Sequence, residues 1–260
     1  MPYLSLPDGL TNLYYVRHRG GAPNAPVVLI HGAGGSRLLW PAALRRLPGA
    51  EVYALDLPGH GRSPGPGCQS VAAYAHVVSE FVAAAGLKAA VLLGHSLGGA
   101  IALEVALRHP ERAAGLVLLC SGARLRVAPA LLAGLRDDYG AALDLLHDCL
   151  FCHETPPTLR QAGKAQLLAA DPQVVCGDFA ACHAFDAMAE LSRVVAPTLV
   201  LGGTADRMTP PKYAEHLAAG IPQARLRLLP QGSHMVALEQ PEAVAEAVSG
   251  FLAELHPAQH

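Results

Sequence analysis

Short apolar runs and longer stretches of helical periodicity alternate through the first half of the chain. The apolar runs are bounded by Gly, Pro, His or Asp and predict buried strands at Val27–Ile30, Val52–Leu55, Ala89–Leu93 and Gly115–Leu119. The stretches between them predict helices at Trp40–Leu47, Ser70–Gly86 and Gly99–Arg108. Strands that alternate with helices in this way indicate a parallel sheet with helices on both faces.

The two ends of the chain complete this sheet. Tyr3–His18 alternates apolar and polar residues around the turn signal Pro7-Asp8-Gly9, which predicts an antiparallel pair of strands. Near the other end, Pro197–Leu201 and Ala224–Leu229 are again strand patterns, and a helical stretch follows them. The sequence therefore predicts the α/β fold class.

The segment from Ala123 to Arg193 breaks the alternation of strands and helices. It has no strand pattern, its apolar residues recur at helical spacing, and Pro129, Pro156-Pro157 and Pro172 divide it into about four helices. We predict that residues 123–192 form a helical cap over a core made of residues 1–122 and 193–260. The alternative is a packing insertion that does not contact substrate. Five of its apolar side chains would either line an acyl pocket or form the cap's own core: Leu146, Phe151, Phe179, Phe185 and Met188.

Composition limits the class of protein. Of the 260 residues, 52% are hydrophobic and 15% charged, which is typical of a globular chain. The net charge of −2 and the lack of a basic run argue against a nucleic-acid surface. No apolar run reaches membrane-spanning length, and the chain opens without the charge pattern of a signal peptide. We expect a cytoplasmic protein with no membrane partner, and the oligomeric state is left open.

The six cysteines fit reduced thiols in the cytoplasm. Cys149-Leu150-Phe151-Cys152-His153 matches the pattern for covalent haem attachment, but that reaction requires export. By residue type alone, a zinc site could be formed by Cys149, Cys152, Cys182 and His183. Because the surrounding residues have helical periodicity, we interpret these cysteines as small buried apolar residues. No metal and no cofactor are expected.

Gly94-His95-Ser96-Leu97-Gly98-Gly99 is the most informative motif. It lies between a predicted strand and a predicted helix, the context in which Gly-x-Ser-x-Gly marks a nucleophile elbow. Such a turn forces the serine into a strained backbone conformation, and its glycines leave room for the neighbouring chain. Ser96 is therefore the candidate nucleophile, and it requires a base and an orienting acid to be active.

The base and the acid follow in the order Ser, Asp, His. Asp206 stands just past the strand pattern Pro197–Leu201, and His234 follows the pattern Ala224–Leu229. The carboxyl ends of strands in an open α/β sheet border the ligand crevice, so the three side chains are expected to meet there. His234 would take the proton from Ser96, and Asp206 would fix the tautomer of His234. The residues after Leu119, Cys120 to Ala123, offer no carboxylate as an alternative acid.

The strand Val27–Ile30 ends in a glycine-rich loop, His31-Gly32-Ala33-Gly34-Gly35. Acyl transfer requires two N–H donors for the developing oxyanion, one after the nucleophile and one from this early loop. The backbone amides of Leu97 and Ala33 are the candidates. A glycine-rich loop after a strand can also bind phosphate. The chain lacks the Lys-Ser/Thr of a P-loop and the third spaced glycine of a dinucleotide fingerprint.

Four motifs together resemble the α/β-hydrolase superfamily, and within it the small esterase, lactonase and haloperoxidase-like branch: His31–Gly35, Asp56–Ser63, Gly94–Gly99 and Gly232–His234. The resemblance covers nearly the whole chain and implies a mostly parallel eight-stranded sheet with a helical cap insertion. It implies Ser96, Asp206 and His234 as the triad, and Ala33 and Leu97 as oxyanion donors. It also implies that His31, with Gly32, supports the oxyanion loop, and that the Asp56–Ser63 turn is architectural. Haloalkane dehalogenases and epoxide hydrolases carry an Asp where this chain has Ser96, so those activities are disfavoured.

The predicted function is hydrolysis of a small carboxylic ester through an acyl-serine intermediate on Ser96. A lactonase that opens a cyclic ester uses the same residues and is the first alternative. The second is a receptor for a small molecule with little turnover, because a fold alone does not fix a function. The presence of Ser96, Asp206 and His234 together favours an enzyme.

Overall fold

One twisted sheet of eight strands forms the centre of the molecule. The computed structural model describes residues 3–20 and 25–255. Its strands are β1 (Tyr3–Ser5), β2 (Asn12–His18), β3 (Val27–Ile30), β4 (Val52–Leu55), β5 (Ala90–His95), β6 (Ala113–Leu119), β7 (Thr198–Gly203) and β8 (Ala224–Leu229). They lie in the order β1-β2-β4-β3-β5-β6-β7-β8. The pairs β1–β2 and β2–β4 are antiparallel and the remaining pairs are parallel, which confirms the predicted fold class.

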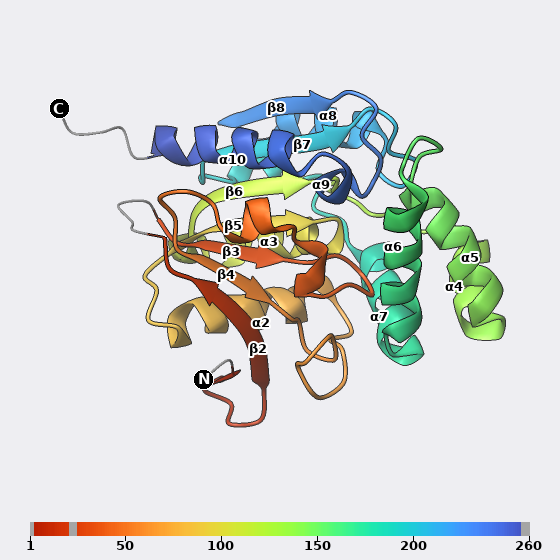
Figure 1. Ribbon diagram of the computed structural model, residues 1–260. Helices are drawn as coiled ribbons and strands as arrows, with labels where there is room; N and C mark the ends of the chain where they lie inside the picture. The colour runs from red at the N-terminus through yellow and green to blue at the C-terminus, as the bar shows by residue number, and fades with distance from the viewer. Residues whose placement is uncertain (1–2, 21–24, 256–260) are drawn as a thin grey trace.

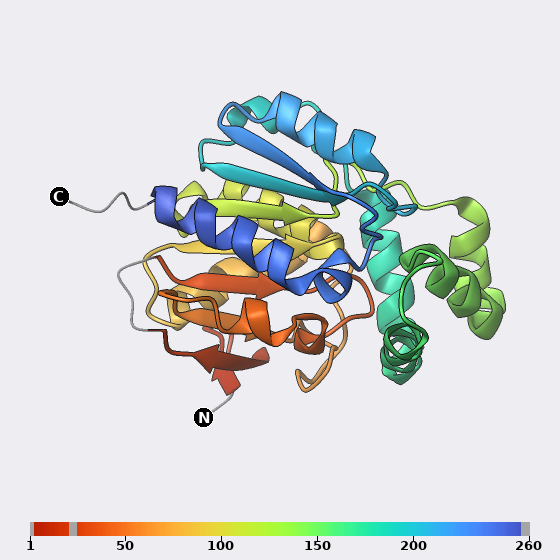
Figure 2. The same ribbon diagram turned by 45° about the horizontal axis from the view of Figure 1, so that its top comes forward.

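Helices cover both faces of the sheet, as Figures 1 and 2 show. One face packs against α2 (Val71–Ala84), α3 (Leu97–Arg108) and α8 (Pro211–Gly220). The other packs against α1 (Ala42–Arg45), α9 (Val236–Glu239) and α10 (Pro241–Leu255). Successive residues of a strand point to opposite faces, so Val28 and Ile30 belong to one core and Val27 and Leu29 to the other. Strands buried on both faces read as continuous apolar runs, which is why the sequence located β3 and β4 so closely.

The segment between β6 and β7 contains four α-helices. They lie at the carboxyl edge of the sheet (Figures 1 and 2). They are α4 (Pro129–Asp137), α5 (Tyr139–Leu150), α6 (Pro157–Ala169) and α7 (Pro172–Ala184). Three of them begin at a proline, which lacks the amide hydrogen that a first helical turn leaves unpaired. The prolines that divide the segment in the sequence are thus the first residues of its helices.

One local prediction needs adjustment. The helix expected at Trp40–Leu47 is a 3₁₀ turn, Arg37–Leu39, followed by the short helix α1, because Pro41 interrupts the stretch between them. The turn at Pro7-Asp8-Gly9 does join the antiparallel strands β1 and β2. Within the described parts of the chain, helices are all too short or too polar to cross a membrane.

Candidate active site

Ser96 lies at the sharp turn between β5 and α3, in a backbone conformation that few residues other than glycine adopt. Its φ is 53° and its ψ is −116°. A Cβ at Gly94 would come within 2.0 Å of the Gly98 carbonyl oxygen, and one at Gly98 within 2.1 Å of the Ile30 carbonyl oxygen. The turn is held from outside, since the Ser96 amide donates to the Leu119 carbonyl over 3.0 Å. This geometry is that of a nucleophile elbow.

Asp206 and His234 are in contact at the carboxyl ends of β7 and β8. His234 Nδ1 donates to Asp206 Oδ2 over 2.9 Å, and both side chains are buried. Asp206 is oriented by other donors: the Met208 and Thr209 amides bond to Oδ1 over 2.8 and 2.9 Å, and the Thr209 hydroxyl bonds to Oδ2 over 2.8 Å. Burial alone would raise the pKa of Asp206, but His234 and these hydrogen bonds lower it to about 2. The carboxylate is therefore ionised at neutral pH.

Three neighbours of this pair were missed by the sequence reasoning. His95 Nε2 donates to the His234 carbonyl over 2.8 Å and so fixes the backbone of that residue. Thr209 lies three residues after Asp206, a spacing typical of a local side-chain turn that could have signalled its role. Glu239 accepts from the Ser233 amide and hydroxyl over 2.8 and 2.6 Å and thereby anchors the loop before His234. Burial lowers the pKa of His95 to about 3, so its ring is neutral.

The loop after β3 has the arrangement expected for an oxyanion hole. His31 Nδ1 donates to the Gly32 carbonyl over 2.8 Å, and its Nε2 accepts from the Leu57 amide over 3.0 Å. The buried ring thus ties this loop to the turn after β4, and burial lowers the pKa of His31 to about 3. Within the described residues, the amides of Ala33 and Leu97 donate no hydrogen bond. Both amides are therefore free to donate to an oxyanion.

Two cavities meet at Ser96 and His234. The inner cavity is bordered by the oxyanion loop and by apolar side chains of the core and of α5, α6 and α7, among them Leu39, Leu146, Leu150, Leu167, Phe179 and Met235. The outer cavity is lined by α4, α5 and the segment after Asp206, and includes Arg126, Arg207 and Tyr213. Ser96 and His234 form no hydrogen bond with each other in this structure. Such bonds are commonly long before substrate binds.

The five apolar residues weighed as an acyl pocket divide into three groups. Leu146 and Phe179 line both cavities. Phe151 and Phe185 are buried in the two cores of the sheet. Met188 is exposed and lines a separate surface hollow with Arg124, Arg126 and Lys212. Helical periodicity alone could not separate these roles, because it places a residue on the apolar side of its helix without saying what covers that side.

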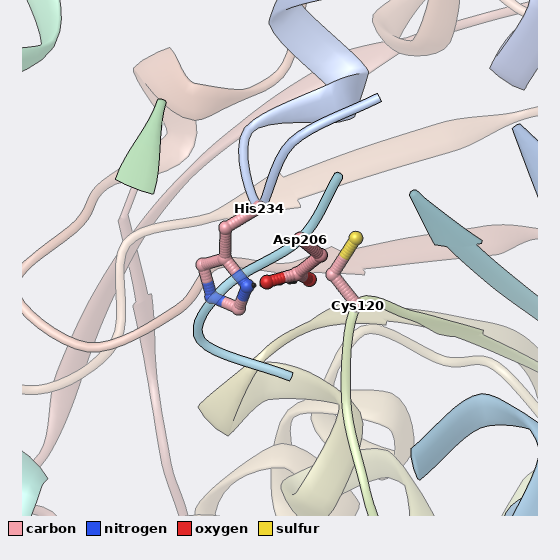
Figure 3. Close-up of side chains that lie close together, drawn as sticks. All are labelled: Cys120, Asp206 and His234. Carbon is pink, nitrogen blue, oxygen red and sulfur yellow. Dashed lines mark hydrogen bonds and ion pairs between the residues drawn. The ribbon is translucent and has the colours of Figure 1, made fainter. Parts of the chain in front are cut away.

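A buried thiol lies beside Asp206 and His234. Figure 3 shows Cys120, at the end of β6, next to Asp206 and His234, and ligand atoms of the three lie within 4.8 Å of one another. These residue types can bind a metal, but their donor atoms here are protonated or already hydrogen-bonded. Burial raises the pKa of the Cys120 thiol well above its ordinary value, and Asp206 is already engaged by His234 and Thr209. We interpret the cluster as the hydrogen-bonded pair of Asp206 and His234 with a neutral thiol packed against it.

The other cysteine hypothesis concerns the four residues Cys149, Cys152, Cys182 and His183. In the described parts of the chain, Cys120, Asp206 and His234 form the one group of three or more potential ligands, so these four residues are not brought together. Cys152 instead lies 3.3 Å from the Thr155 hydroxyl, and His183 Nδ1 donates to the Val127 carbonyl over 3.1 Å. The described cysteines are free thiols.

Comparison with known proteins identifies the class. A model of the alpha/beta hydrolase family matches residues 27–247, and the chain therefore belongs to that family. It is 31% identical to a pimeloyl-[acyl-carrier protein] methyl ester esterase of Neisseria meningitidis, with 91% of this chain and 96% of that protein aligned. The structure of a thermophilic esterase has a TM-score of 0.86 and 32% identity, and covers 98% of this chain and 97% of its own. The enol-lactonase of Burkholderia xenovorans has a TM-score of 0.87 and 26% identity, and covers 97% and 100%. The resemblance to the small esterase and lactonase branch is confirmed, and the chain is an ester hydrolase.

Proposed function

We propose that this ester hydrolase cleaves small carboxylic esters through an acyl-serine intermediate, with Ser96, His234 and Asp206 as its triad. The observation that carries the proposal is the 2.9 Å contact of His234 Nδ1 with Asp206 beside an elbow that holds Ser96 at φ 53°. An ionised Asp206 keeps the proton of His234 on Nδ1, and that leaves Nε2 free to accept the serine proton. Both Ser96 and His234 border the same two cavities, where a substrate would reach them.

The reaction follows from this arrangement in two halves. Ser96 Oγ attacks the ester carbonyl carbon while His234 Nε2 takes its proton, and the carbonyl oxygen becomes an oxyanion facing the Ala33 and Leu97 amides. Collapse of this intermediate breaks the bond to the alcohol oxygen, which receives the proton from His234. Water then attacks the acyl-serine with the same base, releasing the acid and restoring Ser96.

The two cavities suggest where each part of the ester lies. The inner cavity borders the oxyanion loop and is mainly apolar, so it suits the acyl chain. The outer cavity carries Arg126 and Arg207 and suits the alcohol part and its departure. Helices of the predicted cap, residues 123–192, contribute side chains to both. The cap would therefore set substrate size and limit the access of water.

The deciding experiment is hydrolysis of p-nitrophenyl esters from acetyl to dodecanoyl by the wild type and by Ser96→Ala. We expect turnover to vanish in Ser96→Ala with an unchanged circular dichroism spectrum, because the elbow depends on its glycines rather than on the hydroxyl. Ser249→Ala, on α10 away from both cavities, is the matched serine control and should keep the wild-type rate. Residual activity near the wild type in Ser96→Ala would refute the assignment.

A lactonase is the second candidate, favoured by the similarity to the enol-lactonase structure. The same residues would open a ring, and the leaving oxygen would then remain attached to the acyl group. Assays on five- and six-membered lactones beside the linear esters separate the two functions. A lactone with a higher kcat/KM than every linear ester would replace the first proposal by the second.

A further inference from the structure

One buried carboxylate joins the cap helix α7 to three separate parts of the core. Asp178 is fully buried. Its Oδ2 accepts from the Gly34 amide over 2.9 Å and from His60 Nε2 over 2.8 Å, and its Oδ1 accepts from the Tyr74 hydroxyl over 2.7 Å. Gly34 belongs to the oxyanion loop, His60 to the turn after β4, and Tyr74 to α2. The triad does not use any of these four residues.

The proton positions make this an ion pair. His60 Nδ1 faces the Pro58 carbonyl oxygen at 3.0 Å, which can only accept, so this nitrogen carries a proton. Nε2 faces the Asp178 carboxylate, which already accepts from two other donors, so Nε2 carries the second proton. Burial would lower the pKa of His60, but the bond to Asp178 and its charge raise it above the ordinary value. A buried carboxylate is thus matched by a buried imidazolium, as buried charges require.

Packing shows that α7 lies directly on the oxyanion loop. A Cβ at Gly34, whose φ is +61°, would come within 3.1 Å of Val175 on α7 and 3.5 Å of Leu167 on α6. Ala33 also packs against the cap's apolar cluster, which includes Val175 and Phe179. The Gly34 amide, next to the proposed oxyanion donor Ala33, is therefore held by the carboxylate of Asp178 on α7.

We propose that Asp178 is a positioning residue for catalysis: through the Gly34 amide, and with His60 as its counter-ion, it holds the Ala33 amide in place for the oxyanion. The inference rests on the proposed function. Its consequence is that the oxyanion hole is complete only when α7 is seated on the core. The two Asp178 oxygens have separate tasks, because Oδ2 carries the contact with the oxyanion loop and Oδ1 only the contact with α2.

Asp178→Asn is the direct test, since it keeps the shape of the side chain and removes its negative charge. The Asn oxygen can serve either Gly34 or Tyr74, and its amide hydrogens cannot bond to a protonated His60. We expect kcat to fall by about 10- to 100-fold with KM within about threefold, because a misplaced oxyanion donor weakens the transition state more than the bound ester. The inhibition constant of a phenylboronic acid, which forms a tetrahedral adduct with the serine, should rise by the same factor.

Asp171→Ala is the matched control on the same helix. Asp171 caps the start of α7 by accepting from the Gln173 amide over 2.8 Å, and it does not touch the oxyanion loop. This variant should destabilise only the first turn of α7 and leave Asp178 seated on the core, so kcat and boronate affinity should stay within about twofold of the wild type. If Asp178→Asn changes kcat and boronate affinity no more than Asp171→Ala does, the positioning role is overturned.

A second pair of variants keeps the test decisive if Asp178→Asn does not fold. His60→Gln replaces the charged partner of Oδ2 by a neutral amide and so removes the counter-ion of Asp178, whereas Tyr74→Phe removes the partner of Oδ1. We expect His60→Gln to lower kcat several-fold more than Tyr74→Phe, and equal losses would overturn the inference. Ser96→Ala is assayed in parallel. Wild-type activity in that variant refutes the proposed function itself, whereas its inactivity combined with a neutral Asp178→Asn refutes only the role of Asp178.

Discussion

At the scale of single residues, hydrogen bonds other than the one to His234 fix the orientation of Asp206. The Met208 and Thr209 amides both donate to Oδ1, and this leaves Oδ2 for His234 and the Thr209 hydroxyl. Backbone donors cannot accept a hydrogen bond, so any amide placed here must turn its oxygen toward them. The local structure therefore decides which atom of a substituted side chain faces the base.

Asp206→Asn should accordingly lower kcat by a factor of about 10⁴. The Asn oxygen will take the place of Oδ1, and its NH₂ group will face His234 Nδ1 as a donor. The proton of the neutral imidazole then moves to Nε2, where it blocks acceptance of the serine proton. The measurement is kcat with p-nitrophenyl acetate at pH 7 to 8. A rate within tenfold of the wild type would mean that another carboxylate orients His234.

Thr209→Val tests the smaller contribution of the hydroxyl that donates to Oδ2. It removes one of three neighbouring donors and leaves both backbone bonds to Asp206 in place. We expect kcat to fall by about three- to tenfold, because Asp206 loses one charge-assisted hydrogen bond while the two backbone amides still hold its carboxylate. A loss as large as that of Asp206→Asn would show that the hydroxyl, rather than the backbone, sets the orientation of the acid.

At the scale of elements, α6 presents two adjacent leucines to different surroundings. Leu167 is buried, lines the inner cavity and belongs to the apolar cluster against which Ala33 packs, whereas Leu168 is 59% exposed. The pair offers the same substitution inside and outside the proposed acyl site. Helix periodicity makes this possible, because neighbouring residues point about 100° apart around the axis.

Leu167→Ala should enlarge the inner cavity and move the preferred acyl chain to a longer one by about two to three carbons, since the three carbon atoms removed make room for about as many in the acyl chain. It should also lower the free energy of unfolding by roughly 2–5 kcal/mol. Leu168→Ala is the control and should change stability by no more than about 0.5 kcal/mol. The p-nitrophenyl series and urea unfolding measure both effects. An unchanged chain-length optimum in Leu167→Ala would place the acyl chain in the outer cavity.

The elements also show which features the sequence could and could not predict. Strands β3 and β4 and the elbow could be predicted because each depends on residues close together in the chain. The contact of Asp206 with His234 could be predicted because each follows a strand of a parallel sheet, and the carboxyl ends of such strands lie at one edge. The ion pair of Asp178 could not, because its partners Gly34 and His60 lie 144 and 118 positions away. Asp178 belongs to a helical stretch in which a single acidic residue normally faces solvent. Asp178 reaches these partners only because α7 packs on the core.

At the scale of the whole molecule, neutral buried histidines make stability depend on pH. Burial lowers the pKa of both His31 and His95 to about 3, whereas an unfolded chain has its histidines near about 6.5. Between these values the unfolded state binds protons that the folded state does not. The free energy of unfolding therefore falls as the pH falls from about 6.5 toward 3, with each histidine contributing up to about 1.4 kcal/mol per pH unit.

His95→Gln isolates one of these contributions, because its amide can still donate to the His234 carbonyl but does not titrate. The slope of the unfolding free energy against pH, measured by urea between pH 6 and pH 4.5, should be smaller by about 1.4 kcal/mol per pH unit than in the wild type. Carboxylates and the other histidines contribute equally to both proteins and cancel in the difference. His216→Gln, at an exposed position on α8, should leave the slope unchanged. If the slopes of wild type and His95→Gln coincide, His95 is protonated in the folded protein, and its bond to the His234 carbonyl would then come from an imidazolium rather than from a neutral ring.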